Sequence, residues 1–287
     1  MEQDGTVIKI ISSQYTVQTA LGQITAVPAG KLRRDRKPVV GDHVRVSQVQ
    51  DSWRIEEIAP RTNELLRPRT ANVDQALVVT SCKDPDFSPR LLDRLLFLVE
   101  LANVRPVILL TKTDLVPSEE LASIRSLLEE YRRSGYQVLE SCPGSGDEEL
   151  ASILKGRTSV LCGQSGAGKS SLLNRLDPAF QLRTQEISKA LGRGKHTTRH
   201  CELHEVAGGL VADTPGFSSL DFTRLDLSEL DRKITAFAPW IGECRFSDCR
   251  HVNEPDCAVK AAVSEGKIPQ SLYEDYKYLR QEETNRR

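Results

Sequence analysis

Nine consecutive residues near the middle of the chain are suited to holding a polyphosphate. The pattern G-x4-G-K-[ST] is met by Gly163, Gly168, Lys169 and Ser170. Glycines let successive backbone N–H groups turn inward, the lysine reaches the outer phosphates, and the serine hydroxyl is a ligand for Mg²⁺. An apolar run precedes the motif and a helical pattern follows it, as a phosphate loop at a helix N-terminus requires. We therefore predict a nucleotide site that contains Gly163, Gln164, Ser165, Gly166, Ala167, Gly168, Lys169, Ser170 and Ser171.

A second motif indicates which base is bound. Thr111, Lys112, Thr113 and Asp114 follow an apolar strand pattern and resemble the N-K-x-D motif with which GTPases read guanine. The Asp114 carboxylate can accept hydrogen bonds from N1–H and the 2-amino group of guanine. Adenine offers neither donor, so the carboxylate would be left unpaired at a cost of about 1–3 kcal/mol or more. Lys112 would lie along the base and ribose. Thr111 replaces the usual asparagine with a shorter hydroxyl, which bears on nucleotide affinity more than on base identity.

Two shorter motifs complete the expected GTP and GDP site. Ser141 and Cys142 follow a strand pattern where GTPases carry Ser-Ala, a dipeptide whose backbone N–H meets the guanine carbonyl. Asp213-Thr214-Pro215-Gly216 matches the D-x-x-G element of GTPases. We expect Asp213 to hold Mg²⁺ through water and the Gly216 N–H to face the γ-phosphate.

The residue after D-x-x-G bears on hydrolysis. Many GTPases place a glutamine there to orient the attacking water, but this chain has Phe217, which cannot hydrogen-bond to water. Intrinsic hydrolysis should be slow, with the missing group supplied by a loop or a partner. His196 lies in the polar segment 184–199, just before Thr197 and Thr198. We hypothesise that His196 orients the water, although a surface histidine fits the pattern equally well, and that one of the two threonines closes on Mg²⁺.

The order of these motifs is inverted. An ordinary GTPase runs from the phosphate loop to D-x-x-G and then to N-K-x-D, whereas here the base motif at Thr111 precedes the phosphate loop at Gly163. A circular permutation explains the order, because the same sheet can be closed with different chain termini. The segment after Gly216 then leads directly into the C-terminal part, so movement at the γ-phosphate should be transmitted there.

A cluster of metal-ligand residues lies in that C-terminal part. Cys244, Cys249, His251 and Cys257 form C-x4-C-x-H-x5-C in a polar segment. Three thiolates and one imidazole suit a tetrahedral Zn²⁺ with no open position, which is typical of a structural site. Arg245 and other cations around the cluster could touch RNA, although neighbouring acids dilute the patch.

The first 67 residues predict a small β-barrel. Five short, β-branched runs are separated by turns, and no convincing amphipathic helix lies between them. About five strands in so short a unit favour a barrel of the oligonucleotide-binding (OB) type. The loop 31–37 carries five cations and one acid. We expect it to contact an RNA backbone, although a solvated loop is the simpler alternative.

From residue 68 to about 221, strand patterns alternate with helical patterns. This alternation predicts a multidomain α/β chain whose central domain has a parallel sheet with helices on both faces. The runs 201–206 and 209–212 predict a hairpin, and the last domain, 222–287, is polar and helical. We thus expect an OB-fold domain at 1–67, a circularly permuted P-loop GTPase domain at 68–221 and a helical zinc-binding domain at 222–287.

Composition limits the cellular setting. Formal net charge is −1, so RNA contact must come from local patches. Four of the seven cysteines, Cys82, Cys142, Cys162 and Cys201, are scattered singly, which is typical of a reducing compartment. No apolar run approaches the length of a membrane span, and no charged-then-apolar leader opens the chain. We expect a cytoplasmic monomer with no membrane partner.

Together the barrel, the permuted motifs and the Cys/His cluster resemble the small-ribosomal-subunit-dependent GTPase A family of bacteria. The resemblance covers nearly the whole chain and rests most specifically on G-R-G-K-H-T-T at 192–198 and on the zinc spacing. It implies a factor in late maturation of the 30S subunit, whose GTP hydrolysis is stimulated by that subunit and which grips 16S rRNA through the barrel and the zinc domain. It also favours Thr198 as the threonine that closes on Mg²⁺.

Two other classes of function stay open. A P-loop kinase or ATPase is disfavoured by Asp114 and by the run from Asp213 to Gly216. A nucleotide-gated RNA-binding module with negligible turnover would carry the same motifs. Phosphate release with and without small subunits separates this module from a GTPase.

Overall fold

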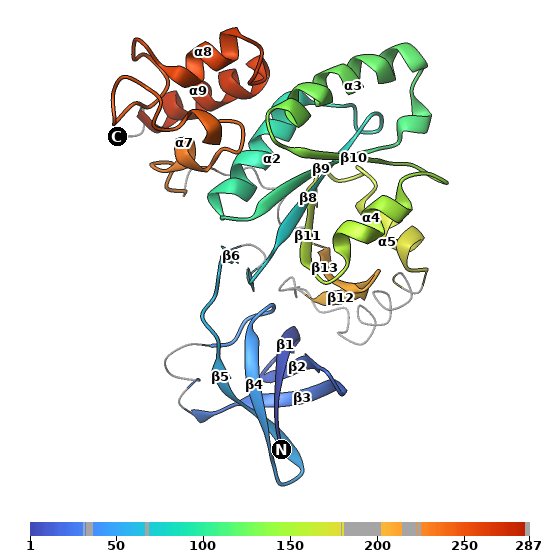
Figure 1. The fold of residues 1–287 in the computed structure, drawn as a ribbon. Helices are drawn as coiled ribbons and strands as arrows, with labels where there is room; N and C mark the ends of the chain where they lie inside the picture. Colours follow the sequence, from blue (N-terminus) through green and yellow to red (C-terminus); the bar gives the residue numbers. More distant parts are fainter. Residues whose placement is uncertain are drawn as a thin grey trace. The chain divides into compact units, whose positions relative to one another are not determined.

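A computed structural model describes residues 1–30, 32, 37–66, 69–178, 180, 202–213, 222 and 225–284. Figure 1 shows the helices and strands in chain order. The chain forms two compact units, each assembled from segments far apart in sequence. The first comprises Met1–Gln75, Ala151–Leu161 and Ser170–Phe217, and the second comprises Ala76–Leu150, Cys162–Lys169 and Ser218–Arg287. Within the described ranges, no helix has both the length and the apolar character needed to cross a membrane.

The N-terminal strands close into a barrel, as predicted. In chain order they are β1 (Glu2–Ile11), β2 (Gln14–Thr19), β3 (Gly22–Pro28), β4 (His43–Val49) and β5 (Ser52–Ile58). The strand order around the barrel is β1-β2-β3-β5-β4, with β3 and β5 parallel and the other neighbouring pairs antiparallel. Alternate residues point inward, and the core includes Val7, Val17, Val44, Val46 and Ile55. The basic loop 31–37 lies outside the described residues except for Leu32 and Lys37.

The segment after the barrel is bonded to it. A short hairpin of β6 (Glu64–Leu66) and β7 (Arg69–Ala71), which the sequence did not predict, lies in this segment. The guanidinium of Arg61 donates to the fully buried Asp42 carboxylate, with Nε–Oδ1 at 2.7 Å and Nη2–Oδ2 at 2.8 Å. Ala71 N–H also donates to Val40 O at 2.8 Å. These bonds fix the segment to the barrel.

A six-stranded sheet carries the predicted nucleotide motifs. Its strands are β8 (Gln75–Ser81), β9 (Arg105–Thr111), β10 (Gln137–Ser141), β11 (Thr158–Gly163), β12 (Leu203–Val206) and β13 (Gly209–Asp213), in the order β10-β9-β8-β11-β13-β12. The pairs β9/β10 and β11/β13 are parallel. The predicted hairpin is confirmed as β12 and β13, so the edge strand β12 is antiparallel and the sheet is mixed. Strands β9 and β11 are buried along almost their whole length, as expected of a sheet covered on both faces.

Helices connect these strands. They are α2 (Pro89–Leu101), α3 (Ser118–Arg133), α4 (Asp147–Leu154) and α5 (Lys169–Leu176). Helix α2 begins at Pro89, because Ser88 is its N-cap and accepts the Leu91 N–H at 3.3 Å, and because proline suits the first helical position. Leu92, Leu95, Leu96 and Val99 form its buried apolar face.

The C-terminal part of the second unit is helical, as predicted. It contains α7 (Leu230–Lys233), the 3₁₀ turn η2 (Ala238–Trp240), α8 (Ala258–Ser264) and α9 (Gln270–Thr284). Two buried carboxyls of α2 bind other elements of this unit. Asp93 Oδ1 accepts the Tyr131 hydroxyl at 2.5 Å, and Glu100 Oε1 accepts the Thr235 N–H at 2.8 Å. Burial raises the pKa of Asp93 to about 8 and that of Glu100 to about 7.

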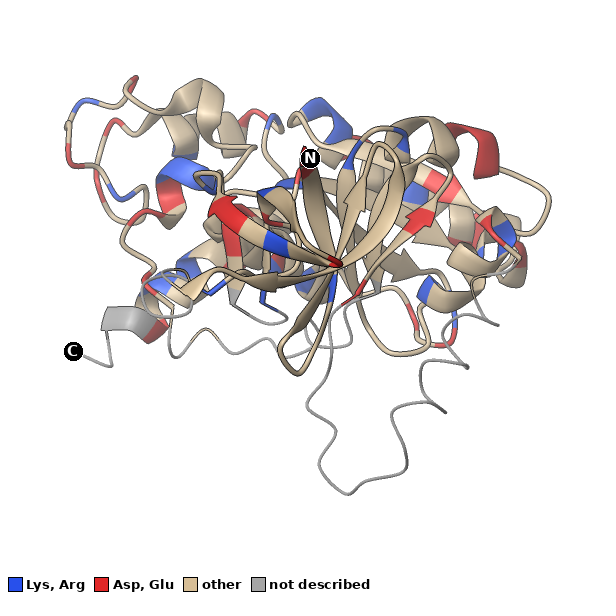
Figure 2. Cartoon of the chain, turned by 90° about the horizontal axis from the view of Figure 1, so that it is seen from below, with Lys and Arg blue, Asp and Glu red and all other residues tan. Residues whose placement is uncertain are grey.

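Charges of both signs are distributed over the chain. The sequence has 39 Lys and Arg residues against 40 Asp and Glu residues, and Figure 2 shows the two kinds interspersed along the described ribbon. Net charge therefore supplies no bulk attraction to a polyanion, and binding must be built from individual groups.

Candidate nucleotide site and metal cluster

The predicted phosphate loop connects β11 to α5, which is the strand–loop–helix context that the motif requires. Gly163 has φ +141°, and a Cβ there would lie 2.2 Å from Val79 O, so only glycine allows the loop to leave the sheet at this point. Gly168, with φ +94°, ends the loop directly before the helix. The site is therefore shaped by backbone conformation.

The side chains of the loop leave it accessible. The Lys169 ammonium donates to Gly163 O at 2.8 Å and to Gln164 O at 2.9 Å, so the lysine lies across the loop. Most loop positions are exposed or half-buried, and the buried Ala167 anchors the loop to the interior. The exposed positions are Gln164, Ser165, Gly166, Ser170 and Ser171. A polyanion can reach the loop from this exposed side.

The structure brings the guanine motif to the phosphate loop. Thr111 is the last residue of β9, and its Oγ1 donates to Ala167 O at 2.7 Å. Lys112 has a left-handed backbone with φ 58° and is followed by the 3₁₀ turn η1 (Thr113–Leu115). The Asp114 side chain is exposed, as a base-reading carboxylate must be. Two motifs separated by about fifty positions in sequence thus meet at one end of the sheet.

One element of this site was missed by sequence reasoning. Lys112 Nζ donates to the carbonyl of Asp84, in the loop between β8 and α2. A Cβ at Gly166 would lie 3.5 Å from Asp84 O and from Pro85 Cδ, so the same loop borders the phosphate loop. The only signal in the sequence was the turn-favouring dipeptide Asp84-Pro85, which gives no hint of a partner.

The second candidate base motif lies beside the first. Ser141 ends β10 in register with Thr111 on β9, so both motifs leave the sheet at the same level. The Ser141 hydroxyl donates to Asp147 Oδ1 at 3.0 Å, and Cys142 and Ser145 exchange backbone bonds of 3.1 and 3.0 Å. The Cys142 N–H is thus engaged in a tight turn, and contact with a guanine carbonyl would require this bond to be shared.

The remaining predicted groups are only partly described. Asp213 ends β13 in register with Leu161, two residues before Gly163, but its side chain lies outside the described residues. Gly216 and the predicted catalytic residues His196 and Thr198 also lie outside the described residues. Ser170 and Asp213 offer the hard oxygen ligands that suit Mg²⁺, which would neutralise charge on the phosphates.

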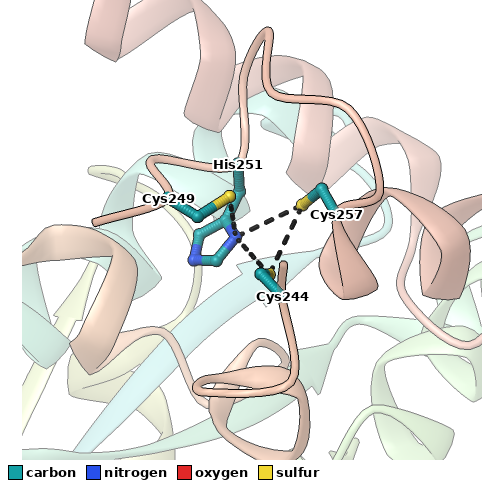
Figure 3. Close-up of side chains that lie close together, drawn as sticks. All are labelled: Cys244, Cys249, His251 and Cys257. Atoms are coloured by element: carbon teal, nitrogen blue, oxygen red, sulfur yellow. Dashed lines mark hydrogen bonds between the residues drawn. The ribbon is translucent and has the colours of Figure 1, made fainter. Parts of the chain in front are cut away.

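The predicted metal ligands converge, as Figure 3 shows. The Nδ1 atom of His251 lies 3.5, 3.4 and 3.3 Å from the sulfurs of Cys244, Cys249 and Cys257, and the sulfurs of Cys244 and Cys257 are 3.8 Å apart. Bonds of about 2.3 Å to sulfur and about 2.0 Å to nitrogen at a tetrahedral zinc place neighbouring ligand atoms about 3.5–3.8 Å apart. All four ligand atoms lie within 4.8 Å of one another, so these residues could hold a metal ion, and the four shorter distances fit zinc.

The surroundings of the cluster hold its ligands in place. The hydroxyls of Tyr273 and Tyr276, both on α9, donate to the carbonyls of His251 and Arg250 at 2.8 and 2.7 Å. His251 and Cys249 are buried, and burial lowers the pKa of His251, which favours the neutral imidazole that binds metal. Four protein ligands, of which all but the half-buried Cys244 are buried, suit a structural role.

Comparison with known proteins agrees with this architecture. Residues 58–223 match the family model "RsgA GTPase", and residues 4–53 match "RsgA N-terminal domain". A relative from Geobacillus kaustophilus, named "Small ribosomal subunit biogenesis GTPase RsgA", is 47% identical over 278 residues, covering 95% of this chain and 94% of the relative. A relative of the same name from Bacillus cereus (strain ATCC 10987 / NRS 248) is 44% identical over 97% of both chains.

Two solved structures share the whole fold. The crystal structure of YloQ, described as a circularly permuted GTPase, superposes with a TM-score of 0.85 at 37% identity, covering all of this chain and 96% of that one. YjeQ from Thermotoga maritima gives a TM-score of 0.84 at 34% identity, with both chains fully covered. The chain therefore belongs to the RsgA GTPase family and is a GTP hydrolase built on a circularly permuted GTPase fold.

Proposed function

We propose that GTP binds where β9, β10 and β11 end, with its phosphates in the loop 163–171 and its guanine against Asp114. The observation that carries the proposal is the bond from Thr111 Oγ1 to Ala167 O, which holds the base motif against the phosphate loop. Asp114 reads the base, while Lys112, Ser141 and Cys142 flank it. Lys169 reaches the outer phosphates, and Mg²⁺ is held by Ser170 and by Asp213 through water. The Gly216 N–H faces the γ-phosphate.

Hydrolysis in this proposal depends on a partner. Phe217 stands where many GTPases have the glutamine that orients water, so the free protein turns over slowly. His196 orients the attacking water and Thr198 closes on Mg²⁺ once the small ribosomal subunit is bound. The names of the relatives, which describe GTPases of small ribosomal subunit biogenesis, support this partner.

In this proposal the other two domains bind RNA. The OB-type barrel (1–67) and the C-terminal domain (222–287) contact 16S rRNA, while the GTPase domain (68–221) sets their geometry according to the bound nucleotide. A single structural Zn²⁺ holds Cys244, Cys249, His251 and Cys257 together. The protein acts as a cytoplasmic monomer in late 30S maturation. Barrels of this type bind single-stranded nucleic acid widely, which supports an RNA role for the first domain.

The deciding experiment measures phosphate release at saturating GTP, with and without purified small subunits. We expect slow release from the free protein and at least a tenfold increase on addition of subunits. Lys169→Ala should abolish both rates, because the lysine side chain that reaches the phosphates is lost, whereas Lys155→Ala serves as a matched control outside the loop. Equal slow rates with and without subunits would instead support an RNA-binding module gated by nucleotide. Displacement of bound GTP by ATP as effectively as by GDP would refute the guanine assignment.

A further inference from the structure

The segment 249–254, here called the ligand turn, has an unusual backbone at the metal-ligand residue His251. Its φ is 59°, in the left-handed region that residues other than glycine rarely adopt. The ring faces the three sulfurs with Nδ1 (Figure 3). Nδ1 is bonded to the ring carbon that carries Cβ, so it reaches less far from the backbone than Nε2 does. The backbone conformation of the ligand turn therefore decides whether His251 can reach the metal.

The side chain of Glu254 holds this backbone through its N–H groups. Oε1 accepts the Arg250 N–H at 2.8 Å, and Oε2 accepts the N–H groups of Val252 and Asn253 at 2.9 and 3.0 Å. These three donors lie on both sides of His251 in the sequence, so one carboxylate joins the two flanks. N–H groups that converge beside a left-handed residue form a nest that suits an anion. In this nest the anion is a carboxylate of the same chain.

The carbonyl groups of the ligand turn are held by the neighbouring helices. Tyr276 and Tyr273, both on α9, donate to Arg250 O and His251 O. The Lys260 ammonium of α8 donates to the backbone carbonyl of Glu254 at 3.1 Å. The N–H groups of the turn are thus fixed by the carboxylate and its carbonyls by α8 and α9, which leaves His251 little freedom to change its backbone conformation.

We propose that Glu254 is a positioning residue for the metal site, whose carboxylate holds the left-handed turn that directs His251 Nδ1 towards the three sulfurs. The inference rests on the proposed structural Zn²⁺. Groups that orient metal ligands from behind contribute about 10- to 100-fold to metal affinity in other proteins. Loss of the carboxylate should therefore weaken metal binding through His251 in particular, while the three thiolates still bind.

The first measurement is the zinc affinity of the full chain, by competition with a chelator. Glu254→Gln keeps the length of the side chain, but an amide has one acceptor oxygen and sets its NH₂ group against the N–H donors. We expect its zinc affinity to fall about 10- to 100-fold. Asp248→Asn is the matched control, because it removes an equal charge from an exposed position beside Cys249. Its affinity should stay within about threefold of the wild type, since exposed charges are screened.

The second measurement separates positioning from a general loss of stability. The visible absorption of bound Co²⁺ depends on its thiolate and imidazole ligands. At full occupancy, Glu254→Gln should show altered bands, because water takes the place of His251. Val263→Ala truncates a buried side chain of α8, outside the ligand turn, and should keep the wild-type bands even if the domain is less stable. GDP affinity within about threefold of the wild type checks that the nucleotide site of each variant is folded.

The outcomes distinguish the inference from the proposed metal site. Wild-type zinc affinity in Glu254→Gln, or a loss no larger than that in Asp248→Asn, would overturn the positioning role. Weaker binding with unchanged Co²⁺ bands would also overturn it, because His251 would then still be a ligand. A wild-type chain that binds no zinc would overturn the metal site itself. Glu254→Asp, whose side chain is one methylene too short for the same bonds, replaces the glutamine variant if that one does not fold.

Discussion

The predicted phosphate loop and the candidate metal cluster differ in what they are built from. The loop is shaped by backbone, with glycines at positive φ and with carbonyls that hold Lys169 and accept from Thr111. The cluster is built from four side chains within one short segment. A site made of backbone depends on the sheet that positions it, whereas a site made of ligands depends on the ion that joins them. The two should therefore fail separately, and for different reasons.

The largest expected effect comes from removing a ligand of the metal cluster. Cys249→Ala removes a buried ligand, and structural zinc in small domains contributes on the order of 10–16 kcal/mol of apparent binding free energy at pH 7. We expect loss of bound zinc and proteolytic sensitivity over residues 225–284, with GDP affinity unchanged within about threefold. Metal analysis, limited proteolysis and nucleotide titration measure these three quantities. Cys142→Ser, outside the cluster, should keep one zinc per chain. Loss of GDP binding together with zinc would show that the two sites are not separate.

A smaller effect is expected from replacing a glycine of the phosphate loop. Gly163→Ala forces a side chain into a left-handed backbone and against Val79 O, 2.2 Å from the added Cβ. We expect a loss of about 2–4 kcal/mol in unfolding free energy from strain and overlap, together with loss of GDP binding. Zinc content should not change. Gly30→Ala, where an added Cβ meets nothing within 4 Å, is the control. Normal GDP affinity in Gly163→Ala would contradict the claim that backbone conformation shapes the phosphate loop.

The smallest effect concerns helix α2, which carries the buried carboxyls Asp93 and Glu100. This helix begins after the loop that contacts Lys112. Because burial raises the pKa of Asp93 to about 8, the folded state holds a proton that the unfolded chain releases near pH 4. Stability should therefore fall as pH rises from about 4 through about 8. Asp93 faces the Tyr131 hydroxyl and Asp275, whose pKa burial also raises.

Asp93→Asn should flatten this slope and stabilise the protein at pH 8 by about 1–3 kcal/mol, because the amide can still accept from Tyr131 without becoming charged. Denaturant unfolding between pH 5 and pH 9 measures both the slope and the stabilisation. Glu119→Gln, an exposed acid at the start of α3, should leave the slope as in the wild type. A wild-type slope in Asp93→Asn would mean that Asp93 is already charged at neutral pH.

Much of the architecture could be predicted because it follows from short-range patterns in the sequence. Five β-branched runs separated by turns indicated the barrel, and the spacing of Cys244, Cys249, His251 and Cys257 indicated a cluster whose side chains do converge. Contacts between segments could not be predicted. Asp93 and Glu100, two helical turns apart, fit a solvated helix face in the sequence, yet both are buried. The bonds from Thr111 to Ala167 and from Lys112 to Asp84 depend on how closely two loops pass, which no periodicity records.

The strand order has a consequence for synthesis of the chain. The barrel closes with strands from the first 58 residues, so it can fold as soon as it leaves the ribosome and presents no open edge. Strand β8 lies between β9 and β11, but β11 begins only at Thr158. One edge of β8 must therefore wait unpaired through the translation of three helices. The permuted order thus leaves a half-formed sheet whose unpaired strand edge is open to aggregation during synthesis.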